Sequence, residues 1–297
     1  MNQDNNQPST TPPQGLPANQ SEGRPPARRP SKKILGIVAG GIIALAIVVG
    51  ALALGNNRDS SSDLVAPQPR TEDYVELMEE LNQLTILNAS EMFQLWIFPD
   101  DPGSDPIPDR VDKILAQEKK VLGLIDDMST MTAVKGDKAV GDEFKKLFVD
   151  KKPDYSQRIQ AGIENYQVIN PLVVEFSQPY RPESSGQAQL SRVKELLQQS
   201  RSASVQHEVN QAVVEKLIEA LETEESFLQD IARAEASGGD ARGVWSNLEQ
   251  YHSVSVISIA NLNNEAYKYF TTDPFVDAIT PMNNLIIERS KDAQSVL

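Results

Sequence analysis

Apolar and polar residues follow two distinct patterns along this chain of 297 residues. An unbroken apolar run without any charged residue occupies 34–55. From Thr71 onward, apolar residues recur every three or four positions, which is the period of a helix with one buried face. Residues 1–33 show neither pattern and are rich in Asn, Gln and Pro. The chain therefore predicts an all-α protein with separate N-terminal and C-terminal parts.

The apolar run 34–55 predicts a single transmembrane helix. A helix of this length extends about 33 Å, while the hydrocarbon core of a bilayer is about 30 Å thick. The alternative is a signal peptide cleaved after Ala53, because Ala51-Leu52-Ala53 has the small-x-small form of a cleavage site. The apolar core of a signal peptide is only about 7–15 residues long, so the uncleaved anchor is favoured.

The charges that flank this helix predict its orientation. Five basic residues precede it, whereas the first one after it is Arg58; the five are Arg24, Arg28, Arg29, Lys32 and Lys33. Basic residues remain on the cytoplasmic side of a membrane. We therefore expect a cytoplasmic N-terminus and a C-terminal domain outside the cell. No second apolar run of this length follows, which predicts a single-pass protein of the cell membrane.

The remaining parts are predicted from composition and periodicity. The segment 1–33 is expected to be a disordered cytoplasmic tail, and 56–70 is expected to be a short linker. Residues 71–297 are expected to form an extracytoplasmic antiparallel helical bundle, because the intervals between their apolar stripes are short. Within this bundle, Thr71 and Asp154 are predicted to cap helices.

One segment of the bundle has an ambiguous pattern. Residues 253–259 alternate between serine and β-branched residues, as a strand does. No turn residues bound the segment, and no partner strand is evident elsewhere. We therefore predict that it belongs to a helix.

Charge and cysteine content narrow the classes of partner and compartment. The full chain carries a formal net charge of −14, and residues after position 33 contribute 23 − 40 = −17 of it. Such an acidic domain argues against nucleic-acid binding, whereas the basic tail suits the anionic inner face of a lipid bilayer. The chain has no cysteine, which excludes a lipoprotein anchor and favours a bacterial envelope protein over a disulfide-rich secreted one.

Two weak patterns suggest metal binding. Glu249 and His252 form an E-x-x-H pair on a predicted helix, the spacing that di-iron bundles use twice, but no second copy is present. The alternative is that His252 hydrogen-bonds to a neighbouring helix. Asp100, Asp101 and Asp105 lie in a proline-rich loop that offers oxygen ligands for calcium. An acidic turn between two helices explains the same residues, so no metal and no cofactor is predicted.

The transmembrane segment itself contains a candidate helix interface. Gly36 and Gly40 form a G-x-x-x-G pair, and Ala46 and Gly50 repeat the small-x-x-x-small spacing. Small residues allow two membrane helices to approach closely. The pattern predicts a homodimer or a membrane partner along this face, although small residues are also frequent in isolated membrane helices.

No pattern in the chain identifies a catalytic residue. The sequence favours a non-catalytic binding or structural protein of the cell envelope. A first alternative is an extracytoplasmic ligand sensor or solute-binding bundle that signals through a partner. A second alternative is an envelope enzyme that uses paired carboxylates, although nothing in the sequence selects a pair.

Overall fold

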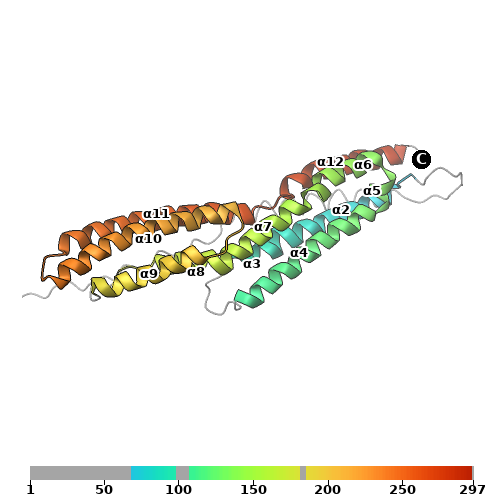
Figure 1. Ribbon diagram of the computed structural model, residues 1–297. Helices are drawn as coiled ribbons and strands as arrows, with labels where there is room; N and C mark the ends of the chain where they lie inside the picture. The colour runs from blue at the N-terminus through green and yellow to red at the C-terminus, as the bar shows by residue number, and fades with distance from the viewer. Residues whose placement is uncertain (1–67, 98–106, 181–184, 296–297) are drawn as a thin grey trace, which may run out of the picture. The chain divides into compact units, whose positions relative to one another are not determined.

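The computed structural model describes residues 68–97, 107–180 and 185–295, which all belong to one compact unit. Every regular element in these residues is a helix (Figure 1), which confirms the all-α prediction for this part of the chain. The elements are α2 (Thr71–Thr85), η1 (Ile86–Met92), α3 (Phe93–Ile97), α4 (Ile107–Thr130), α5 (Thr132–Gly136), α6 (Lys138–Leu147), η2 (Val149–Lys151), α7 (Lys152–Glu164), η3 (Asn165–Ile169), α8 (Asn170–Phe176), α9 (Gly186–Ser202), α10 (Glu208–Ala236), α11 (Arg242–Thr271) and α12 (Val276–Ser295).

Among the described helices, none has the length and apolar content needed to cross a membrane. The predicted disordered tail 1–33 and transmembrane helix 34–55 lie outside the described residues, together with most of the predicted linker 56–70. The membrane anchor therefore remains a prediction from the sequence.

One group of helices builds its core around α2, α4, α6, α7 and α12. Helix α12 packs against α2 and α6, while α4 packs against α2 and α7. Aromatic rings lie at the centre of this group: Phe148 stacks between Phe144 and Phe275, with ring centroids 5.0 and 5.9 Å apart. All three rings are almost fully buried. Their burial joins the last two helices of the chain to its middle part.

A second group is built around α10, which packs against α9 on one side and α11 on the other. In Figure 1, α10 and α11 run alongside each other for most of their length. Leu217 and Leu228 of α10, together with Leu248 and Ile259 of α11, have no solvent exposure. The continuous helical segment formed by α7, η3 and α8 connects the two groups, because α7 packs on α4 and α11 while α8 packs on α9.

The reversal between α10 and α11 is enforced by a glycine. Gly238 adopts a φ of 71°, a left-handed conformation that side chains disfavour. The amide of Gly239 donates to the carbonyl of Ala234 at 2.8 Å, and the amide of Gly238 donates to that of Glu235 at 3.1 Å. This pair of bonds is a Schellman motif, which ends a helix and satisfies its last carbonyls. Helix α10 therefore ends at Ala236.

Two predicted helix caps are wrong by one to three residues. Thr71 is the first residue of α2, and the cap is Arg70, whose amide donates to Asp73 at 2.6 Å. Helix α7 begins at Lys152, because Pro153 fits the first turn of a helix, where no amide donor is needed. Asp154 therefore lies inside α7, where its carboxylate accepts a hydrogen bond from Arg158 at 3.0 Å.

The π-helical segment η1 shifts the buried face of the helix that continues into α3. In a regular α-helix the residue seven positions after the buried Asn88 would be Leu95, but the buried residue is Trp96. A π-helix has more residues in each turn than an α-helix, so the stripe shifts by one position. Gln117 donates to the carbonyl of Leu87 in η1 at 2.8 Å, so a side chain from α4 supplies a partner there.

The ambiguous segment 253–259 is helical and lies in the middle of α11, as predicted. Its alternating appearance has a structural reason. Ser255 and Ile259 face the core, whereas Val254 and Ile257 are each 63% exposed on the opposite side of the helix. Apolar residues therefore lie on both the buried face and the exposed face of this part of α11. Their order along the chain resembles that of a strand, although the segment is a helix.

The closed helical core predicts that the C-terminal part folds without lipid. We expect a fragment that begins at Pro67 to be soluble and monodisperse, with strongly helical circular dichroism, because its apolar stripes are buried against one another. A fragment that dissolves only in detergent, or that gives a β-rich spectrum, would refute this prediction. The full-length chain in detergent is the matched control for helix content.

Candidate functional site

The strongest candidate site is a buried ionisable cluster formed by Tyr180, Glu224 and His252, here called the Glu224 cluster. Glu224 lies on α10 and is 1% exposed, while His252 lies on α11 and is 8% exposed. Nδ1 of His252 lies 2.8 Å from Oε1 of Glu224, and the Tyr180 hydroxyl donates to Oε2 at 2.5 Å. Both oxygens of one buried carboxylate are thus engaged by different segments of the chain.

The hydrogen bonds define the protonation of this cluster. Burial, followed by the charge of Glu224 and the hydrogen bond to it, raises the pKa of Tyr180 well above its usual range, so the phenol remains a donor. Nε2 of His252 is buried without a hydrogen-bond partner. An unpartnered acceptor costs less than an unpartnered N–H, so we assign the neutral tautomer with its proton on Nδ1, pointing at Glu224.

Aromatic rings surround the histidine of the Glu224 cluster. The centroid of the His252 ring is 5.1 Å from that of Phe176 and 5.0 Å from that of Tyr180. Tyr180 also meets Trp245 edge to face at 6.2 Å. These rings come from α8, from the connection that follows it and from α11. They shield the carboxylate from water, which strengthens its hydrogen bonds.

The structure does not bring Glu249 and His252, the pair suggested for metal binding, together in one site. Glu249 is exposed on α11, and the carboxylate that meets His252 is Glu224 on the neighbouring helix. This matches the alternative interpretation of His252 as a histidine bonded to an adjacent helix. In the ranges that the structure describes, no three His, Asp or Glu residues are grouped as a metal site would require. Asp100, Asp101 and Asp105 lie outside the described residues, as do Gly36, Gly40, Ala46 and Gly50 of the predicted membrane interface.

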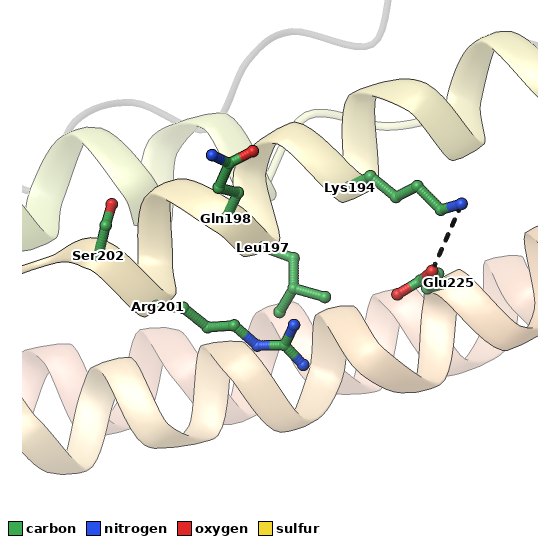
Figure 2. A pocket seen from close by; sticks show the side chains of 6 residues that line it. All are labelled: Lys194, Leu197, Gln198, Arg201, Ser202 and Glu225. Carbon is green, nitrogen blue, oxygen red and sulfur yellow. Dashed lines mark ion pairs between the residues drawn. The ribbon is translucent and has the colours of Figure 1, made fainter.

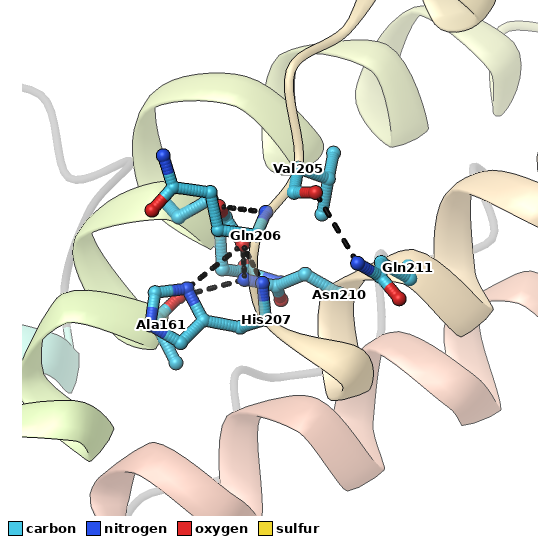
Figure 3. Close-up of polar contacts among 8 residues, drawn as sticks. Ala161, Val205, Gln206, His207, Asn210 and Gln211 are labelled. Carbon is cyan, nitrogen blue, oxygen red and sulfur yellow. Dashed lines mark hydrogen bonds and ion pairs between the residues drawn. The ribbon is translucent and has the colours of Figure 1, made fainter.

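A second polar network centres on Glu164 at the end of α7. Figure 3 labels its partners Gln206, His207 and Asn210. The Glu164 carboxylate accepts hydrogen bonds from the amide of Gln206 at 2.6 Å and that of His207 at 3.2 Å, and from the Asn210 side chain at 2.9 Å. Nδ1 of His207 lies 3.1 Å from the same carboxylate. Burial alone would raise the pKa of Glu164, but these hydrogen bonds outweigh it and lower the pKa below its usual value. Glu164 thereby fixes the start of α10.

Buried amides continue this network between helices. The side chain of Asn210 donates to the carbonyl of Ala161 at 2.8 Å, and Asn165 donates to both Asn210 and Asn263 at 2.9 Å. The residues come from α7, η3, α10 and α11. Because each amide bonds to another element, the network holds four segments in register.

A shallow groove on α9 and α10 has a cavity volume of about 500 Å³. Figure 2 shows its lining: Lys194, Leu197, Gln198, Arg201, Ser202 and Glu225. Lys194 pairs with Glu225 at 3.7 Å, and Arg201 pairs with Glu222 at 2.6 Å. Its charged groups are thus already neutralised by neighbours, and neither buried network opens into this lining.

Glu224 and Asn210 were not predicted as site residues, although the sequence contains a signal for both. Glu224 and Asn210 stand at positions of the apolar stripe of α10, between Leu221 and Leu228 and before Val213. A polar residue within a buried stripe must find a hydrogen-bond partner. No comparable signal marks Tyr180, which lies in the connection after α8.

Comparison with protein-family models, with curated protein sequences and with solved structures found no match to this chain. Its function is therefore argued from its own residues.

Proposed function

We propose that this chain is a membrane-anchored, non-catalytic binding or structural protein of the cell envelope, with its helical bundle outside the cell. The apolar run 34–55 serves as the anchor, and the basic residues that precede it keep the N-terminus in the cytoplasm. The bundle then acts as a rigid body that presents its surface to partners.

The observation that carries this proposal is that the carboxylates of Glu164 and Glu224 are hydrogen-bonded within the chain. Glu164 and Glu224 each accept hydrogen bonds from other segments of the chain, and neither is among the residues that line the groove of Figure 2. A catalytic acid or base has to reach a substrate proton directly or through one water molecule. Carboxylates that are bonded to several chain segments are typical of a structural role.

A sensor is the second candidate, and the Glu224 cluster favours it. Tyr180 ties the connection after α8 to both α10 and α11 through one carboxylate. Loss of either hydrogen bond to this carboxylate would therefore loosen that connection, and a partner protein would have to read the change.

Protease accessibility tests the anchor and its orientation. We expect protease added to intact cells without their wall to digest 71–297 and to spare the tail 1–33, because the basic flank holds the tail inside. An epitope on each end followed by immunoblotting measures the two outcomes. Cells permeabilised with detergent are the control, in which both ends should be cut. Protection of 71–297 while the tail is cut would reject the orientation, and release of the domain without protease would reject the uncleaved anchor.

A further inference from the structure

The outer face of α11 differs from the remaining surface of this acidic chain. Between Gly243 and Asn264 the only charged residue is Glu249, and none occurs from Gln250 to Asn264. That uncharged stretch extends over about four helical turns, or roughly 22 Å. Its outward residues nevertheless face solvent. We call this face the neutral stripe: Asn247, Gln250, Val254, Ile257, Asn261 and Asn264, all exposed.

The spacing of the neutral stripe is that of a helix-pairing seam. Its members recur at intervals of three and four residues, which gives three successive a and d positions of a heptad repeat. Val254 and Ile257 form the middle pair and are each 63% exposed, while amide side chains occupy the outer pairs. Exposed β-branched residues at consecutive a and d positions indicate contact with another helix.

The stripe is symmetric about its own centre. Two identical helices that run antiparallel, with the dyad between Ser255 and Val256, place each a position of one copy opposite a d position of the other. Val254 then meets Ile257. The outer layers are equally matched, since they pair an amide with an amide: Gln250 with Asn261, and Asn247 with Asn264. A face that complements itself under a two-fold rotation fits an isologous contact between two copies.

The lack of charge along the stripe favours a second copy as its partner, because two acidic chains can approach there without repulsion between like charges. Glu249 falls at a c position of this heptad and points away from the seam, so it does not disturb the contact. The dipoles of the two helices also oppose each other favourably in the antiparallel direction.

We propose that the neutral stripe of α11 is a homodimer interface, in which two copies of this chain pair antiparallel. The inference goes beyond the membrane tether proposed above and does not depend on it. A single helix pair buries less than the roughly 1,600 Å² of a standard interface, so the contact is weak and depends on concentration. Anchoring both copies in one membrane would raise their effective concentration without any new contact.

The absence of cysteine allows a direct test in the full-length chain. Two variants, Asn247→Cys and Asn264→Cys, are mixed and oxidised mildly, and one of them carries a mass tag. In the antiparallel pair positions 247 and 264 are neighbours, whereas the two copies of 247 are about 25 Å apart along the helix axis. We expect the mixed disulfide to exceed either self-disulfide by at least tenfold. Random collision gives only the statistical twofold excess.

A second pair of variants links the disulfide to the apolar centre. Adding Ile257→Glu to both cysteine chains should return the mixed product to the statistical ratio, because two carboxylates then face the middle of the seam. Val276→Glu on α12 is the matched control, since Val276 is also exposed, at 56%, but lies outside the stripe, and it should leave the excess unchanged. Circular dichroism checks that both variants remain helical. Dominant self-disulfides would show parallel pairing, and a statistical ratio in the parent pair would show no pairing; either result overturns the proposal.

Discussion

Replacing Leu217 by Ala should lower the free energy of unfolding by about 2–5 kcal/mol, the range for large-to-small changes at fully buried positions. Leu217 has no solvent exposure and lies on α10, the helix against which both α9 and α11 pack. The lost methyl groups leave a cavity that neighbours on two sides cannot fill without moving their backbones. Urea unfolding of the 67–297 fragment, followed by circular dichroism, measures the change.

Leu115→Ala is the matched control for this prediction. Leu115 has the same side chain on the long helix α4, but it is 39% exposed, so we expect a clearly smaller loss than at Leu217. The dependence of stability on urea should be equally steep in both variants, because neither changes the surface exposed on unfolding. Equal losses at both positions would contradict the described packing of α10.

The apolar stripes of the helices were predictable, because a buried helix face places apolar residues three or four positions apart in the sequence. Leu77, Leu81 and Leu84 of α2 follow the spacing of three or four residues, and all three are buried. Leu217 and Leu221 of α10 are buried in the same way. These positions follow from the regular rotation of an α-helix from one residue to the next, so they can be recognised from the sequence alone.

The sequence could not reveal where that rotation changes. The shift from Leu95 to Trp96 follows from a π-helical segment, whose extra residue per turn is stabilised by partners on other helices. Asn88 in η1 accepts a hydrogen bond from Tyr155 at 2.9 Å, across a separation of 67 residues. Such a contact exists only after the fold has formed, so no local pattern announces it.

The candidate site was only partly predictable for a similar reason. The sequence offered His252 as a metal ligand beside Glu249, with a hydrogen bond to a neighbouring helix as the alternative. The choice of Glu224 over Glu249 depends on the pairing of α10 with α11, which local spacing does not encode. The strand-like segment 253–259 likewise became interpretable only when Val254 and Ile257 proved to face outward.

Replacing Glu224 by Leu should also be strongly destabilising, although it adds an apolar side chain to the core. The change removes the acceptor of two buried donors, the Tyr180 hydroxyl and Nδ1–H of His252. Each orphaned donor costs about 1–3 kcal/mol, so the expected loss in the free energy of unfolding is about 2–6 kcal/mol. An unchanged or increased stability would show that the buried carboxylate costs more than its hydrogen bonds return, as replaced buried ion pairs sometimes do.

A double-mutant cycle with Tyr180→Phe separates the orphaned hydroxyl from a simple loss of packing. Phe keeps the ring against His252 and Trp245 but has no hydroxyl to leave unpaired. Tyr180→Phe alone should cost about 0.5–1.5 kcal/mol, the net value of one hydrogen bond. In combination with Glu224→Leu, it should restore part of the loss, because one of the two orphaned donors is then absent. Strictly additive losses would mean that Tyr180 and Glu224 contribute independently, which the 2.5 Å contact between their oxygens does not allow.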